Sequence, residues 1–328
     1  MRTASIPPVC IRLTLIVLAA GPVTQVSAQS WQPQRPVRWM VPYVPGGATD
    51  LVTRTVAEPL GAALGQQFVV DNRPGATGTI AYDLVARANP DGHTITTAPD
   101  ALTVLPFSYK KLPFDPRTSF APITNMTRQP MAIAVNAAIP VRTMKELIDY
   151  AKSKAGAVSY ATSGLGTSQH LFSEMLKQAT GMDITHIPYK GAGQAIIDLA
   201  GGQLQLAMVG ASSILPQAKA GRARVIAVTS GKRWWTLPEV PTLIESGLVG
   251  YEFYHWIGVF GPAKLPRDIV SRLNGEIGRV LASPPIRERL TAAGLEIAPS
   301  TPEQLAADVR EGMQRWGKVI ADAKLEFK

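Results

Sequence analysis

The chain has 328 residues, of which 33 are Lys or Arg and 24 are Asp or Glu, and its formal net charge is +9. The basic residues form no long run and aromatic residues make up only 7% of the chain, so the composition does not favour nucleic-acid binding. A chain of this length can bury a sizeable core without disulfides, and it has room for one large or two medium domains.

Residues 1–28 have the pattern of a secretory signal peptide. Arg2 and Arg12 are basic, residues 13–20 are apolar, and residues 26–28 form a small-residue cleavage site that ends at Ala28. The apolar run is too short to span a membrane. The one cysteine, Cys10, lies in this leader. We therefore expect an exported protein whose mature chain has no disulfide and no cysteine metal ligand.

The mature chain begins with alternating strand-like and helix-like segments. In order, they are a strand at 37–41, a glycine loop at 45–50, a helix at 51–64, a strand at 68–71, a glycine loop at 72–78, a helix at 80–88 and a strand at 94–98. Gly65 follows the first helix, at a position where glycine commonly ends helices.

The middle of the chain repeats this order. The second set is a strand at 158–162, a loop at 163–168, a helix at 169–180, a strand at 184–188, a glycine loop at 190–193, a helix at 194–200 and a strand at 204–209. Alternating strands and helices predict parallel strands, and two copies of one unit predict two α/β lobes.

Other segments connect and follow the two units. Loops are expected around Pro106, Pro113, Pro116, Pro122 and Pro130. Strands are expected at 131–135, 224–229 and 256–260, and helices at 144–155, 267–282, 285–293 and 302–325. Thr143 is a plausible N-cap, with Glu146 three residues later. Leu305, Val309, Met313 and Trp316 recur at helical spacing, which indicates core packing.

Two loops carry the functional prediction. Each follows a strand and opens a helix, so each presents free backbone N–H groups at the positive end of a helix dipole. Such a loop is an anion site made of neutral groups. Ligands of open α/β sheets sit at the carboxyl ends of strands, where both loops lie. We expect the two loops to face each other and to hold one acidic ligand.

Several side chains near these loops have two interpretations. Thr49 and Asp50, like Thr167 and Ser168, could contact the ligand or only cap helices. Asp100 follows a strand and could line the pocket. Trp256 could form an apolar wall or simply be buried in the core.

Other chemistries find little support in the sequence. His170 and Glu174 share a helix face, but no further ligand completes a metal motif. The loop at 163–168 lacks the last glycine of the dinucleotide fingerprint, and no G-x-S-x-G elbow is present. We therefore expect no metal, no cofactor and no enzymatic activity. The alternative is a secreted hydrolase or isomerase that uses Asp50 or Asp100 as a base.

The chain resembles the substrate-binding proteins of tripartite tricarboxylate transporters, the TctC-like or Bug family. The segments that carry the resemblance are 42–50 (PYVPGGATD), 71–75 (DNRPG), 90–92 (PDG), 109–116 (YKKLPFDP), 160–161 (YA), 166–167 (GT), 170–171 (HL), 188–191 (PYKG) and 240–242 (VPT). The resemblance extends over essentially the whole mature chain.

The resemblance implies a type II periplasmic-binding-protein-like fold, with two α/β lobes that close on a ligand in the cleft between them. We expect lobe 1 to comprise residues 29–132 and 253–328, and lobe 2 residues 133–252. It further implies a periplasmic monomer that captures a small carboxylate, such as a dicarboxylate, tricarboxylate or aromatic carboxylate, and delivers it to a two-subunit membrane transporter. A receptor that presents its ligand to a sensor is a further alternative.

The resemblance also implies a set of ligand contacts. They are Tyr43, Gly46, Gly47, Ala48, Thr49 and Asp50 in one lobe, and Ser163, Gly166, Thr167 and Ser168 in the other. One departure concerns Val209 and Gly210, where relatives often have Asp and Asn. An apolar Val209 would suit a ligand with an apolar or aromatic body better than an amino acid.

Overall fold

The computed structural model describes residues 31–154, 156–189, 191–323 and 325. The predicted signal peptide lies outside these residues, as do the last residue of the predicted helix at 144–155 and the first residue of the loop at 190–193. In the part of the chain that the structure describes, no helix has both the length and the apolar character needed to cross a membrane.

The first predicted unit is confirmed, with small shifts at its ends. It contains β1 (Val37–Val41), α1 (Ala48–Leu64), β2 (Phe68–Asn72), the 3₁₀ segment η1 (Ala76–Gly78), α2 (Thr79–Ala86) and β3 (Thr94–Pro99). Gly65 ends α1 with a φ of +67°, the left-handed conformation that glycine adopts at low cost. The 3₁₀ segment η2 (Asp100–Thr103) and the short helix α3 (Leu105–Ser108) follow, where Pro106 suggested only a loop. Proline is compatible with the first turn of a helix.

The second unit is likewise confirmed. It contains β5 (Val158–Thr162), α5 (Ser168–Thr180), β6 (Ile184–Pro188), α6 (Ala192–Ala200) and β7 (Leu206–Gly210). Before it come β4 (Phe120–Asn136) and α4 (Met144–Ser153), and after it α7 (Ala211–Lys219) and β8 (Ala223–Val228). The Thr143 hydroxyl caps α4 by accepting from Glu146 N at 3.1 Å. Helix α7 was not predicted, because Pro216 interrupts its helical pattern.

The C-terminal part contains β9 (Tyr254–Pro262), α8 (Arg267–Ala282), α9 (Pro284–Ala292), the short β10 (Glu296–Ile297) and α10 (Pro302–Ala323). The three predicted C-terminal helices are therefore confirmed. Strand β10 was not predicted, and it pairs antiparallel with β4.

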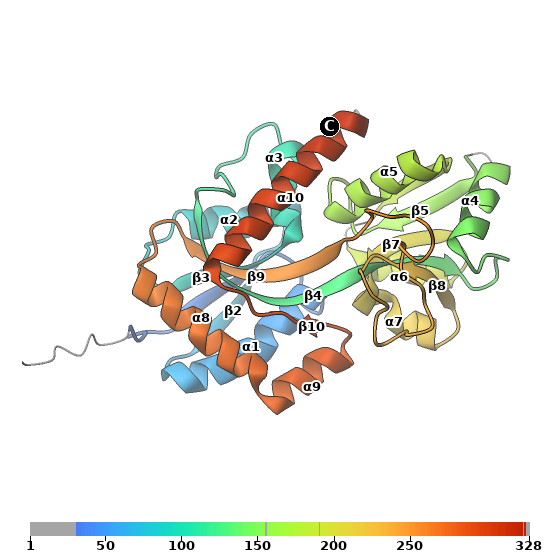
Figure 1. Ribbon diagram of the computed structural model, residues 1–328. Coiled ribbons are helices and arrows are strands. Elements are labelled where there is room, and N and C mark those ends of the chain that lie inside the picture. Colours follow the sequence, from blue (N-terminus) through green and yellow to red (C-terminus); the bar gives the residue numbers. More distant parts are fainter. Residues whose placement is uncertain (1–30, 155, 190, 324, 326–328) are drawn as a thin grey trace, which may run out of the picture. The chain divides into compact units, whose positions relative to one another are not determined.

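The strands form one continuous sheet in the order β2-β1-β3-β9-β4-β7-β5-β6, with β8 and β10 also paired to β4. The strands β1, β2 and β3 are mutually parallel, as are β5, β6 and β7. Strand β4 pairs with β9 up to Pro130 and with β7 from Met131 onward. Figure 1 shows β4 and β9 running across from one set of helices to the other.

The length of β4 corrects the sequence analysis, which placed loops at Pro122 and Pro130 and began the strand at 131. Both prolines lie inside this 17-residue strand. The register shifts between Pro122 and Thr124, and the partner strands change after Pro130. Proline cannot donate a ladder hydrogen bond, so within a sheet it is confined to places such as these, where the regular pairing is interrupted.

Apolar clusters lie on both faces of each half of the sheet. Helices α1 and α8 cover one face of the first half, with Val56, Leu60 and Ile277 fully buried. Helices α6 and α7 cover one face of the second half, and α4 and α5 cover the other. This is the α/β organisation in two lobes that the sequence predicts.

Helix α10 contributes to the cores of both halves. Leu305 and Val309 belong to the cluster that contains Met40 and Phe260 from the first half. Trp316 and Val319 belong instead to the cluster built on β5, β7 and α5. The second half of α10 thus packs against the core of the second half of the sheet. The predicted limits of the lobes, which assign 253–328 wholly to the first lobe, stay a prediction.

Candidate functional site

The first glycine loop connects β1 to α1 and leaves backbone donors open. Leu51 N donates the first intrahelical hydrogen bond, to Gly47 O at 2.9 Å. The amides of Ala48, Thr49 and Asp50 therefore have no acceptor within the helix. A Cβ added at Gly46 or Gly47 would meet no atom within 4 Å, so a small molecule can approach this backbone. These properties are those of an anion site at a helix N-terminus.

The helix begins three residues earlier than predicted, which changes the roles of two side chains. Gly47 is the N-cap of α1, and no side chain caps this end. Thr49 and Asp50 therefore lie in the first turn and are not caps, which corrects that interpretation. Both side chains are buried.

Asp50 holds the first loop together from inside. Its carboxylate accepts hydrogen bonds from Gly46 N at 3.0 Å, from Arg54 Nε at 3.0 and 3.1 Å, and from Asn72 Nδ2 at 2.9 Å. Asn72 also donates to the Tyr43 carbonyl at 2.9 Å. Burial alone raises the pKa of Asp50, but the hydrogen bonds from Gly46, Asn72 and Arg54 lower it below its usual value. A carboxylate with a lowered pKa is a weak general base.

The second loop connects β5 to α5, and one of its threonines caps the N-terminus of α5, which is one of the two roles considered for it in the sequence. Thr167 is the N-cap of α5. Its hydroxyl accepts from His170 N at 3.3 Å and donates to the Gly164 carbonyl at 2.8 Å. The Ser163 hydroxyl donates to Gln169 Oε1, which also accepts from Ser163 N at 3.1 Å. Both hydroxyls are therefore used within the loop.

Several amides of the second loop are also bonded to its own side chains. Gly164 N donates to Thr162 Oγ1 at 3.2 Å, and Gly166 N donates to His170 Nδ1 at 3.3 Å. Leu171 N donates the first intrahelical bond of α5, to Thr167 O at 3.0 Å. Ser168 and Gln169 thus keep amides without an acceptor in the helix. This loop offers fewer free donors than its glycines and hydroxyls suggested.

The dipeptide Ser108–Tyr109, at the end of α3, lies against loops from both halves of the molecule. The Ser108 hydroxyl donates to the Gly166 carbonyl at 3.3 Å, and the Tyr109 hydroxyl donates to Thr77 Oγ1 at 3.2 Å. Tyr109 is also close enough to Tyr43 to raise the pKa of that phenol. The dipeptide thus contacts the second glycine loop at Gly166 and the loop at 72–78 at Thr77. Sequence reasoning missed Ser108 and Tyr109, because the prolines around them indicated an ordinary connecting loop.

Asp100 and Tyr43 lie at the same edge of the sheet. Asp100 is 4% exposed, and its Oδ1 lies 3.0 Å from His255 Nδ1. Tyr43 is half-buried on the first loop. Burial, and then the charge of Asp100, raise the pKa of Tyr43 far above its usual value, so its hydroxyl keeps its proton at neutral pH.

Two predicted contacts are placed in the core instead. Val209 is fully buried in the apolar cluster under α6 and α7. Its neighbour Met208 faces the opposite cluster, as the alternation of side chains along a strand requires. The apolar wall predicted at Val209 is therefore wrong. Trp256 is 9% exposed and packs with Phe260 at a ring-centroid distance of 6.2 Å, which is the core placement weighed in the sequence analysis.

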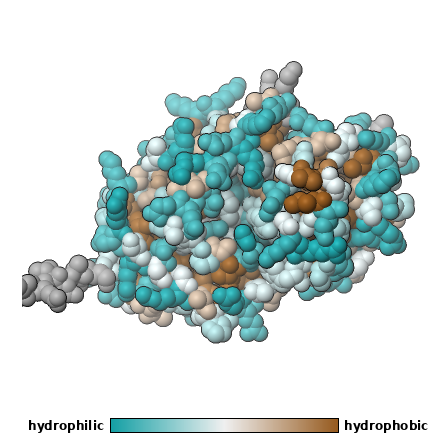
Figure 2. All heavy atoms as spheres, in the orientation of Figure 1, coloured by the Kyte–Doolittle hydropathy of each residue, from teal (hydrophilic) through white to brown (hydrophobic). Residues whose placement is uncertain are grey.

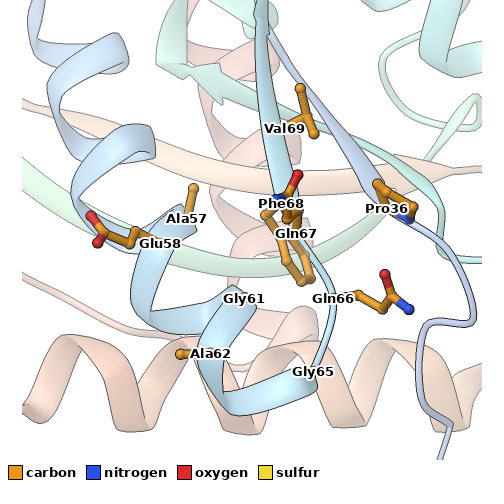
Figure 3. Close-up of a pocket in the computed structure, with 10 residues that line it drawn as sticks. All are labelled: Pro36, Ala57, Glu58, Gly61, Ala62, Gly65, Gln66, Gln67, Phe68 and Val69. Atoms are coloured by element: carbon orange, nitrogen blue, oxygen red, sulfur yellow. The ribbon is translucent and has the colours of Figure 1, made fainter.

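A surface hollow of about 640 Å³ lies away from both loops. Figure 3 shows it between the end of α1 and the start of β2. Its lining includes Gly61, Gly65 and Phe68. Because it lies at the amino end of β2, it is not at the strand ends where α/β sheets bind ligands. The face seen in Figure 2 is mostly hydrophilic, with small separate groups of apolar residues. Among the described residues, no cluster of three or more His, Cys, Asp or Glu side chains could hold a metal ion.

The fold and the paired strand-end loops define a two-lobed binding protein. A model of the tripartite tricarboxylate transporter family receptor, TctC, matches residues 52–325. The chain belongs to this family of solute-binding receptors.

Individual relatives agree with this assignment. The UPF0065 protein in the tcbD-tcbE intergenic region of Pseudomonas sp. (strain P51) is 38% identical over 294 residues, which cover 89% of this chain and 88% of that protein. The periplasmic binding protein BugD is 37% identical, with a TM-score of 0.80, over 90% of this chain and 99% of that chain. R. palustris Rpa4515, solved with adipate, is 35% identical, with a TM-score of 0.83, over 89% and 98% of the two chains. The resemblance to the Bug family is confirmed.

Proposed function

We propose that this receptor captures a small carboxylate at the N-termini of α1 and α5. The observation that carries the proposal is the open backbone of the first loop. The amides of Ala48 and Thr49 have no acceptor in the helix, and the space beside Gly46 and Gly47 is empty. Charge-assisted hydrogen bonds contribute roughly 1.5–3 kcal/mol each, so a few such amides account for useful affinity without a buried arginine.

The second loop contributes to the proposed grip through the amides of Ser168 and Gln169. Its other polar groups fix the shape of the loop. The adipate in the related Rpa4515 structure supports a carboxylate as the ligand class. We further propose that the protein works in the periplasm as a monomer and delivers its ligand to a two-subunit membrane transporter, as the family name suggests.

A thermal-shift screen of the purified protein against mono-, di-, tri- and aromatic carboxylates tests this proposal. A ligand at 100 times its Kd should stabilise the protein by about 2.7 kcal/mol. Sugars and simple cations serve as negative controls. Stabilisation by those compounds, with none from any acid, would contradict the proposed ligand class.

The variant Gly47→Val tests the location of the site. Gly47 has a φ of −81° and no atom near an added Cβ, so the fold should accept valine while the side chain covers the open amides. We expect at least about a tenfold loss of affinity, equivalent to 1.4 kcal/mol. The matched control is Gly275→Val on the exposed face of α8, where an added Cβ also meets nothing. Equal affinities for the two variants would place the ligand elsewhere.

A further inference from the structure

Gln129 lies on β4 immediately before that strand passes from one half of the sheet to the other. It pairs with His255 of β9, whereas Met131 pairs with Gly210, the last residue of β7. Gln129 is 6% exposed, although its side chain ends in a polar carboxamide. Burying such a group costs free energy unless its acceptor and its donors find partners. Both ends of the carboxamide are therefore expected to have a role.

The oxygen of this carboxamide caps α7 from a distance. Gly210 is the N-cap residue of α7, and no side chain of its own caps the helix. Ser212 N, in the first turn, donates instead to Gln129 Oε1 at 2.8 Å. A backbone N–H can only donate, so this bond fixes which end of the carboxamide is the oxygen. Nε2 therefore points away from Ser212, and it has no acceptor among the residues that the structure describes.

The missing side chain at Gly210 makes room for the carboxamide. An added Cβ there would lie 3.0 Å from Gln129 Nε2 and 3.1 Å from both Cδ and Oε1. Gly210 has a φ of −57°, which any residue can adopt, so glycine is favoured here by space and not by backbone conformation. Gln129 and Gly210 thus form a matched pair, in which a side chain from β4 fills the place of the one that residue 210 lacks.

The carboxamide lies at the edge of the sheet that carries the second glycine loop. Strands β5 and β7 are adjacent and parallel, with Ala161 opposite Ala207. The loop at 163–168 begins two residues beyond Ala161, and Gly210 lies three residues beyond Ala207. Ligands of α/β sheets bind at this carboxyl edge. The N–H groups of Gln129 Nε2 are therefore at the same edge as the loop whose free donors are few.

We propose that Gln129 is a ligand-binding residue of the second half, and that its Nε2 donates a hydrogen bond to the carboxylate of the bound ligand. A neutral carboxamide can donate to an anion without a second charge being buried. The bond from Ser212 already holds the side chain in place, so little entropy is lost when the ligand binds. The inference rests on the proposed carboxylate site, and it adds a side-chain donor beside a loop whose own hydroxyls are used internally.

Gln129→Glu separates ligand binding from capping. A glutamate keeps an oxygen that accepts from Ser212 N, and its charge is favourable at the N-terminus of a helix, so urea unfolding should show wild-type stability. The donor is replaced by a charged acceptor, which is ionised at about pH 8. At this pH we expect the acid that binds most tightly in the carboxylate screen to lose at least about tenfold in affinity by calorimetry, equivalent to 1.4 kcal/mol. A residue that only caps α7 would show no such loss.

Gln205 offers a matched control at the amino end of the same strands. Its Oε1 accepts from Ser159 N at 3.0 Å, so Gln205→Glu makes the same chemical change in a side chain that also bonds a backbone amide. This variant should bind the acid as tightly as the wild type. Equal losses in Gln129→Glu and Gln205→Glu would show that added negative charge anywhere weakens binding, and would overturn the role of Gln129.

A double variant tests the pairing of Gln129 with Gly210. Gln129→Ala removes the proposed donor, and we expect binding about three- to tenfold weaker. When Gly210→Asn is added, the new side chain fills the vacated space from the N-cap position that asparagine favours, and a carboxamide returns to this edge. Affinity should then recover to within about threefold of the wild type. Gly210→Asn alone crowds Gln129 and should not improve binding.

The outcomes separate this inference from the proposed function. A wild type that binds no carboxylate in the screen overturns the proposed function, and this inference with it. A wild type that binds a carboxylate, together with a stable Gln129→Glu that binds it equally well, overturns the role of Gln129 and leaves the carboxylate site standing. If Gln129→Glu does not fold, Gln129→Ala decides, and unchanged affinity in that variant overturns the role.

Discussion

The Ser108 hydroxyl lies 3.3 Å from the Gly166 carbonyl, 58 positions away, and 3.3 Å from the Val104 carbonyl, so its one proton is shared between the two acceptors. Ser108 ends α3, next to the first half of the sheet, and Gly166 lies in the loop before α5 of the second half. This contact joins a segment of one half to a proposed ligand loop of the other. It therefore depends directly on how the two halves are arranged.

We expect Ser108→Ala to speed ligand release up to several-fold, because this contact between the two halves contributes a hydrogen bond worth about 1 kcal/mol to the arrangement in which we propose the ligand is held. Stopped-flow measurement of the dissociation rate checks this prediction. Ser153→Ala is the control, since that hydroxyl donates to the Tyr150 carbonyl within the same turn of helix. Identical dissociation rates in the wild type and Ser108→Ala would show that the contact does not affect the bound state.

The ion pair between Arg54 and Asp50 should matter for binding more than for stability. Arg54→Ala removes two hydrogen bonds to Asp50 and one to Asn72 Oδ1, which loosens the loop that carries the open amides. We expect a three- to tenfold loss of affinity. The cost in stability should be under about 1 kcal/mol, because the Arg54 side chain is 47% exposed.

Arg87→Ala is the matched control for Arg54→Ala, because Arg87 also pairs with an aspartate four residues earlier in a helix, at 2.7 Å from Asp83. It should leave the affinity unchanged. Calorimetric titration of both variants, with denaturant unfolding, measures the two effects. Similar losses of affinity in both would contradict a specific role for Arg54.

Stability should fall in mild acid because of a stacked histidine pair beneath the second loop, in which His170 is buried and His186 is half-buried. His186 stacks on His170 at 4.1 Å between ring centroids and contacts Thr162 Oγ1 through Nε2 at 2.8 Å. Burial, and then the charges of His170 and Lys177, lower the pKa of His186 to about 3. Burial also lowers the pKa of His170.

A base with a lowered pKa in the folded state binds more protons when unfolded, so its contribution is present above pH 6.5 and is lost as the pH falls toward 3. Between pH 7 and pH 5 the unfolding free energy of the wild type should fall. In His186→Gln we expect this fall to be smaller by about 1 to 2 kcal/mol. Urea unfolding at the two pH values measures this difference. Parallel pH profiles for both proteins would contradict the assignment.

Trp316 should be a major contributor to stability. It is 1% exposed and meets Phe253 at a ring-centroid distance of 5.3 Å. Trp316→Ala should cost about 3–5 kcal/mol, the range for a buried tryptophan. Trp235 is 41% exposed, so Trp235→Ala should change stability by about 0.5 kcal/mol or less. Chemical denaturation compares the two, and a small loss in Trp316→Ala would mean that α10 contributes little to the second core.

Local patterns in the sequence were sufficient for most of the helices and strands. The strand at 37–41 and the helix at 267–282 have the predicted bounds. Gly65 and Gly181 end their helices with φ of +67° and +66°. These features depend on periodicity and backbone freedom within a few residues, and they also revealed the repeated unit and both glycine loops.

The tertiary structure decided what the side chains of the loops do. Sequence could not show that Asn72 bonds Asp50 from 22 residues away, or that Ser108 lies 3.3 Å from the Gly166 carbonyl, 58 residues away. Nor could it place Val209 in the core or His255 beside Asp100, 155 residues away. Strand and helix formation follow from local chemistry, whereas the partners of a polar group depend on which distant segments the folded chain brings within about 3 Å.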